Sequence, residues 1–199
     1  MGPILMAVFA LTGKEVVQLM STAQMIVGAL AIALCLLFIF ANLGKWLSNR
    51  LLFLLAYIGI ILMYIVSYPW PMWSHHLKPF NETTFAGCNP SEYGWCDTVL
   101  ASSLWALIPI MVAVLGLCIP ATAISLDAIY AKVLGDIDQS FMQSVLAVAE
   151  DIVLVVVPIY SSAIFTAAGM PILWIVNFSI SLIAVVVWLA VWRPVGKYQ

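Results

Sequence analysis

The sequence predicts an all-α protein that crosses a membrane several times, and two observations predict it. The first is a set of long runs without a charged residue: 16–44, 51–74, 98–126 and 152–192. A helix needs about 20 apolar residues to cross about 30 Å of hydrocarbon. The second is composition, since 65% of the residues are hydrophobic and 8% are charged, whereas about 25% of a soluble domain is charged. We therefore expect a single membrane domain (1–199) with five transmembrane helices and a partial helix at the N-terminus.

The first elements are a short apolar segment and two spans. Residues 1–11 are apolar but, at about 17 Å as a helix, too short to span a bilayer. We predict the end of a helix there, or a segment lying in the membrane interface. Transmembrane helices are predicted over 17–41 and 51–68, joined by a short basic link. Pro69 and Pro71 end the second of these helices, because proline has no amide hydrogen to donate.

The remaining spans follow a long polar connection. Residues 74–97 form the only connection long enough to fold on its own. The third transmembrane helix is predicted over 99–126, kinked by Pro109 and Pro120, and a short loop is predicted over 127–138. The last two transmembrane helices are predicted over 139–165 and 172–192, with a tight turn at 168–171 between them.

Basic residues orient the chain in the membrane. With five spans, the basic residues of one side are Lys45, Arg50, Lys132, Arg193 and Lys197. The other side carries only Lys14 and Lys78. An excess of basic residues marks the cytoplasmic side. The C-terminus is therefore predicted to be cytoplasmic, and residues 74–97 to be lumenal or extracellular.

Two features of the polar connection agree with that orientation. Asn81 begins the pattern Asn-Glu-Thr, an acceptor for N-glycosylation, which marks a surface loop of a secreted or lumenal segment. Cys88 and Cys96 bracket a turn-rich stretch and are expected to form a disulfide in an oxidising compartment. The alternatives are a chance glycosylation pattern and two free thiols.

A polar stripe crosses the fourth span. Glu150 and Asp151 lie near its middle, and Gln143 and Ser144 precede them by two helical turns on the same face. An acid at this depth costs about 2.5–3.5 kcal/mol on insertion scales and normally faces a partner, water or the interior of a bundle. We expect the stripe to point away from lipid and interpret these four residues as candidates for transport or proton coupling. The alternative is a structural pair that bonds to a polar side chain on another span.

Composition and spacing argue against several other functions. A net charge of -2 provides no basic field, so we expect no nucleic-acid partner. No tandem cysteine or histidine spacing suggests a metal site. Neither an intramembrane histidine–aspartate cluster nor a metalloprotease pattern is present. We therefore expect no enzymatic activity, no catalytic residues, no metal and no cofactor.

Three local patterns resemble one family of transporters. In chain order they are Gly87-Cys88-Asn89-Pro90 with Trp95-Cys96, then residues 130–135 followed by Gln139-Ser140, then Pro158 with Gly169 and Leu173-Trp174. They are similar to the glycosylated paired-cysteine lumenal loop, the loop after the tenth helix and the last two helices of one branch of the major facilitator superfamily, whose C-terminal half the order of elements resembles. The likeness is closest to its lysosomal branch associated with neuronal ceroid lipofuscinosis. It covers nearly the whole chain and implies helices seven to twelve, with 1–11 as the end of the seventh.

The resemblance implies a transporter of a solute or ion across an endolysosomal membrane. In this superfamily the solute site lies between two six-helix halves. The implied partners are the lipid bilayer, an unknown small solute or ion, and an N-terminal six-helix half. The chain departs from the family at Val155–Val157, which replace small residues, and at Glu150 and Asp151, which the family pattern does not predict. The alternative from another class is a non-transporting membrane interaction or scaffold protein.

Overall fold

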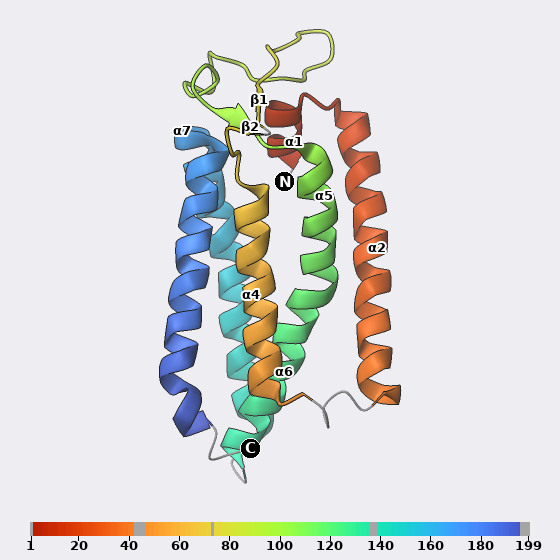
Figure 1. Cartoon of the computed structure of the whole chain (residues 1–199), viewed down its shortest axis with the longest axis vertical. Coiled ribbons are helices and arrows are strands. Elements are labelled where there is room, and N and C mark those ends of the chain that lie inside the picture. The colour runs from red at the N-terminus through yellow and green to blue at the C-terminus, as the bar shows by residue number, and fades with distance from the viewer. Residues whose placement is uncertain (1, 42–46, 73, 136–138, 196–199) are drawn as a thin grey trace.

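The computed structural model describes residues 2–41, 47–72, 74–135 and 139–195, and it is mostly helical (Figure 1). Within these described ranges, four helical segments are long and apolar enough to cross a membrane: Gly13–Phe40, Asn49–Ser67, Leu104–Leu134 and Ser140–Arg193. They run along the long axis of the molecule (Figure 1). The chain is therefore a multi-pass membrane protein whose apolar helices contact lipid. Two of the basic residues that orient the chain, Lys45 and Lys197, lie outside the described ranges.

The N-terminal segment forms a short helix of its own, α1 (Gly2–Phe9), and α2 (Gly13–Phe40) follows it. Thr12 and Glu15 form a capping box, in which the Glu15 carboxylate accepts the Thr12 amide at 2.8 Å. Such a cap satisfies amide groups that the first turn leaves open, so α2 begins before the expected start at 17. The buried residues of α1 are Ile4, Leu5, Ala7 and Val8. This segment is thus packed against the rest of the protein.

Helix α4 (Asn49–Ser67) lies close to the second predicted span. The Ser48 side chain caps its start, and it ends before the first of two prolines. At its beginning it is tied to α7 (Gln139–Val195). The guanidinium of Arg50 donates to the Trp192 carbonyl at 3.1 Å, and the rings of Phe53 and Trp188 lie 4.1 Å apart.

The third membrane segment is one continuous helix in three parts: α5 (Leu104–Ala113), the π-helical turn η1 (Val114–Cys118) and α6 (Ile119–Leu134). The π turn lies between Pro109 and Pro120, where the sequence predicts a kink. Each proline leaves one helical carbonyl without its usual donor. Local π geometry is one way in which membrane helices re-pair such groups.

The limits of this segment correct the sequence-based expectation. It begins at Leu104 rather than at 99, because Leu100–Ala101 form strand β2. It ends at Leu134. Residues 127–134 are therefore helical, and the prediction of a loop over them is wrong. Asp127 has an exposed side chain within α6. A charge on the open face of a helix does not interrupt the backbone hydrogen bonds, which is why the helix continues through it.

Small residues let three helices meet at η1. A Cβ added to Gly116 would lie 2.8 Å from the Cβ of Leu30 on α2. One added to Gly59 of α4 would lie 2.6 Å from the sulfur of Cys118. Because lipid tails are as apolar as leucine, membrane helices associate mainly through this kind of close packing.

Helix α7 is a hairpin with two arms. Gly169 has non-helical angles (φ 77°, ψ -174°), and the two arms lie side by side with the turn at one end of the bundle (Figure 1). A positive φ of this kind favours glycine. The Tyr160 hydroxyl of the first arm donates to Asn177 Oδ1 of the second arm at 2.7 Å. The tight turn expected at 168–171 is therefore present.

The connection between α4 and α5 folds over one end of the bundle (Figure 1). Within it, β1 (His75–His76) pairs in antiparallel fashion with β2 (Leu100–Ala101). A buried cluster joins α1, this connection, α5 and the turn of α7: Ile4, Ala7, Val8, Cys88, Trp95, Ala101, Leu107, Phe165, Met170, Leu173 and Trp174. The buried cluster thus lies at this end of the bundle, which we call the loop end.

Candidate functional site

The polar stripe lies on the first arm of α7 and faces outward. Gln143, Ser144, Glu150 and Asp151 are all exposed, and so is every residue from 147 to 159. No other part of the described chain covers this stretch. The stripe therefore does not face the interior of the bundle that the described residues form.

Neither carboxylate has a partner in the described part of the chain. Glu150 and Asp151 make no hydrogen bond or ion pair there. Asn177, on the neighbouring arm, is instead bonded to Tyr160 and to the Leu173 carbonyl. A charged acid in hydrocarbon is expensive, so the pair requires water, a cation or polar groups from another chain segment.

A crevice at the loop end continues the line of the stripe. Pro158 lies two turns beyond Asp151, about 10 Å along the helix axis, and Ser162 lies one turn further. A crevice of about 180 Å³ opens here between α1 and the α7 hairpin, lined by Pro3, Ile4, Pro158, Ser161, Ser162, Phe165 and Leu173. A shallow depression along the first arm also includes Pro158 and Ser162.

The exposed face of the first arm offers a series of oxygen atoms. Pro158 has no amide hydrogen, so the carbonyl of Leu154 loses its usual helical donor. The Asp151 carboxylate, this carbonyl and the Ser162 hydroxyl follow one another along the arm, within about three turns of helix. The carboxylate can accept a proton, and all three oxygen groups can contact a small cation or accept hydrogen bonds from a polar solute. Among the residues that the structure covers, no group of three histidine, cysteine or acidic side chains is placed to hold a metal ion.

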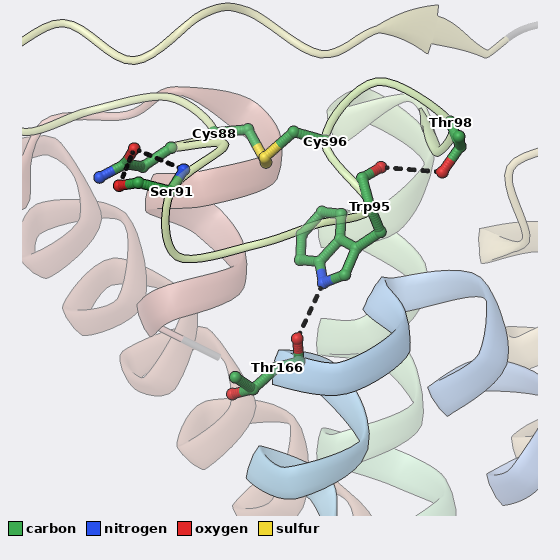
Figure 2. The surroundings of a disulfide bond; sticks show 7 residues. Cys88, Ser91, Trp95, Cys96, Thr98 and Thr166 are labelled. Carbon is green, nitrogen blue, oxygen red and sulfur yellow. Dashed lines mark hydrogen bonds between the residues drawn. A yellow bond between two sulfur atoms is a disulfide. The ribbon is translucent and has the colours of Figure 1, made fainter.

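The disulfide loop at the loop end fixes the turn of α7. Cys88 and Cys96 form a disulfide, with their Cα atoms 5.7 Å apart. Figure 2 shows the indole of Trp95 pointing from this loop to α7, where its N–H donates to the Thr166 carbonyl at 3.2 Å. The indole packs on Phe165, 5.2 Å between ring centroids. It also covers Gly169, where an added Cβ would lie 3.0 Å from the ring.

Trp95 is the residue that the sequence-based interpretation of the site missed. A tryptophan beside a loop cysteine, together with a glycine in a tight turn, was the available signal. A missing Cβ leaves room for a flat ring to approach the backbone closely. The sequence did not indicate which of the eight tryptophans takes this position.

Asn81 is exposed on the same connection. Its side-chain oxygen accepts the Thr83 amide at 3.0 Å, which is the Asx-turn geometry common at loop asparagines. The amide nitrogen to which a glycan would be attached is thus on an accessible turn.

The chain was compared with models of known families, with curated proteins and with solved structures, and no significant match was found.

Proposed function

We propose that this chain is the C-terminal half of a major-facilitator-type transporter, which moves a small solute or ion across an endolysosomal membrane. In this proposal the two arms of α7 cross separately, which gives five transmembrane helices in all. The basic residues assign the C-terminus to the cytosol, and the loop end with Asn81 and the disulfide then lies in the lumen.

The observation that carries the proposal is the unpaired Glu150–Asp151 pair on the open face of α7. Intramembrane acids are rare, and they mark ion paths and proton relays more often than packing sites. Here the pair is in line with Pro158 and Ser162, which line a crevice at the loop end. The Asp151 carboxylate, the Leu154 carbonyl freed by Pro158 and the Ser162 hydroxyl place polar groups at intervals between mid-membrane and the loop end, which suits a wall of a solute path.

The same observation argues for a partner that covers this face. An uncovered acid pair would contact lipid at a cost of about 2.5–3.5 kcal/mol per acid. A second six-helix bundle placed against the first arm of α7 would enclose the acids in a water-filled path. Transporters of this superfamily place their site at such an interface between halves.

The proposal is tested with the double variant Glu150→Gln/Asp151→Asn, which removes both charges. The protein is reconstituted into vesicles together with the second bundle that covers α7, where such a partner is bound. Proton flux is measured with a trapped pH-sensitive dye after an imposed pH gradient. We expect the double variant to lower the flux at least tenfold, because a proton relay requires a titrating group at mid-membrane. The matched control is Asp127→Asn, which removes an exposed carboxylate from α6 and should leave the flux unchanged.

Equal flux in the wild-type protein and the double variant would contradict the transport role of the pair. Flux in the wild-type protein no higher than in protein-free vesicles would favour the second candidate, a non-transporting interaction protein. Exposed apolar residues at the loop end support this alternative, since Met72, Phe85 and Trp105 are respectively 82%, 70% and 89% exposed. An interaction protein would give no flux above that of protein-free vesicles.

A further inference from the structure

A second cavity lies on another side of the molecule, between the end of α4 and the second arm of α7. Its volume is about 320 Å³, at the lower end of the range for small-molecule sites. Its aromatic walls are formed by Tyr64, Tyr68, Trp70, Trp174 and Phe178. It shares no lining residue with the crevice beside the acid pair.

The walls of the cavity are set by helix geometry. Tyr64 lies in the last turns of α4, and Tyr68 is the residue that follows the helix, four positions on. Trp174 and Phe178 are one turn apart on the second arm of α7, so these two side chains face the same way. Tyr64 and Trp174 meet edge to face, with 6.1 Å between ring centroids.

Trp70 closes the end of the cavity that lies beyond α4. Its indole N–H donates to the Ile65 carbonyl at 2.8 Å, and its ring contacts Tyr68 at 5.3 Å between centroids. The hydrogen bond satisfies one of the carbonyls that the last turn of a helix leaves open. The indole is therefore held in place, and the cavity is already formed without a ligand.

The lining indicates a ligand without polar groups. Almost no polar atom faces the cavity, and water does not stably occupy an apolar space of this kind. A fatty acid or a sterol that entered completely would bury its own polar group without a partner, which is unfavourable. A hydrocarbon chain that enters while its polar head stays outside avoids that cost.

The mouth of the cavity is continuous with the lipid-facing surface. Ile65 and Ile175 line it and are 41% and 49% exposed. Exposed apolar residues extend the same helix faces away from the mouth, Leu62 and Ile58 on α4 and Leu182 on α7. Tryptophan is favoured at the level of lipid headgroups, and Trp70 lies just past the end of α4.

We propose that this cavity binds one acyl chain of a membrane phospholipid, with the headgroup at the level of Trp70. The acyl chain leaves one hydrocarbon environment for another, so the transfer itself provides little driving force for binding. Binding is instead favoured by dispersion contacts with fixed aromatic walls. This site does not depend on the transport proposal.

The first test is native mass spectrometry of the full chain purified with dioleoylphosphatidylcholine. We expect one phospholipid to stay bound under conditions that remove loosely attached lipid. Ile175→Trp fills the mouth and should lower the retained fraction by about tenfold, because the added ring removes dispersion contacts between the acyl chain and the cavity walls. The matched control is Leu182→Trp, which adds the same ring to an exposed site on the same arm and should retain the lipid.

Loss of lipid from both variants, or no retained lipid in the wild-type protein, would overturn the proposal. A second measurement covers the case in which Ile175→Trp does not fold. The side chain of Trp174 is 3% exposed, so an acyl chain contacts it only from inside the cavity. Its emission, taken as the difference between wild type and Trp174→Phe, should be quenched by phosphatidylcholine brominated near the headgroup. Unquenched Trp174 emission would equally contradict the proposal.

Discussion

At the scale of single residues, Trp95 links two parts of the chain that are far apart in sequence. Its indole is 5% exposed and contacts both Phe165 and Gly169 of the α7 turn. The adjacent disulfide limits how far this loop can move from the turn. The tryptophan therefore determines how the loop end closes over the hairpin.

Trp95→Ala should destabilise the protein by about 3–5 kcal/mol, the usual cost of removing a large buried aromatic side chain. The measurement is thermal unfolding of the detergent-solubilised protein, followed by circular dichroism. Trp105→Ala is the control, because Trp105 is 89% exposed and its removal leaves no cavity. Equal losses of stability in the two variants would contradict the anchoring role of Trp95.

The sequence predicted the positions of the candidate functional residues but only some of their contacts. The positions of Glu150 and Asp151 on one helix face follow from helical periodicity alone. Their exposure on the surface of the described bundle does not, since it depends on which helices pack against α7. The pairing of Cys88 with Cys96 was indicated by their loop, whereas the contact between Trp95 and Gly169 is a tertiary event that no local pattern specifies.

At the scale of elements, η1 is where α2 and α4 approach the third segment most closely through glycine. Gly116 faces Leu30, and Gly59 faces Cys118. The backbone of α2 is also near, since an added Cβ at Gly116 would lie 3.3 Å from the Val27 carbonyl oxygen. This contact holds α2, whose described residues are otherwise mostly exposed.

Gly116→Ala should destabilise the protein by about 1–2 kcal/mol, because the new methyl group overlaps Leu30 and forces the helices apart. Gly28→Ala on α2 is the matched control. A Cβ there meets nothing within 4 Å, so the change should be neutral or should stabilise the helix by up to about 1 kcal/mol. Thermal unfolding distinguishes the two variants, and a Gly116→Ala protein as stable as Gly28→Ala would show that η1 is not closely packed.

The long helices were predictable because a run of apolar residues is a strong local signal. The ends of these helices were less predictable, for a physical reason in each case. The capping box of α2 extends the helix into polar residues, and α6 continues past Asp127 because that side chain points outward. The short strands β1 and β2 depend on pairing across the whole connection, which local propensity does not specify.

At the scale of the whole molecule, the described bundle is asymmetric. Its buried cluster lies at the loop end, whereas the middle of the first α7 arm is exposed on all sides. The proposed function assigns opposite roles to these regions. In that proposal the loop end is a fixed lumenal cap, and the exposed arm is the face that lines a path and meets a second bundle.

The central claim is that the chain crosses the membrane five times, with the disulfide loop away from the cytosol. It is tested most directly in sealed vesicles whose cytosolic face is outward, with an epitope tag after Gln199. We expect added protease to remove the tag and leave the 74–97 connection intact, and glycosidase treatment to shift the wild-type protein but not Asn81→Gln. Cleavage within 74–97 in sealed vesicles, or protection of the tag, would contradict the account.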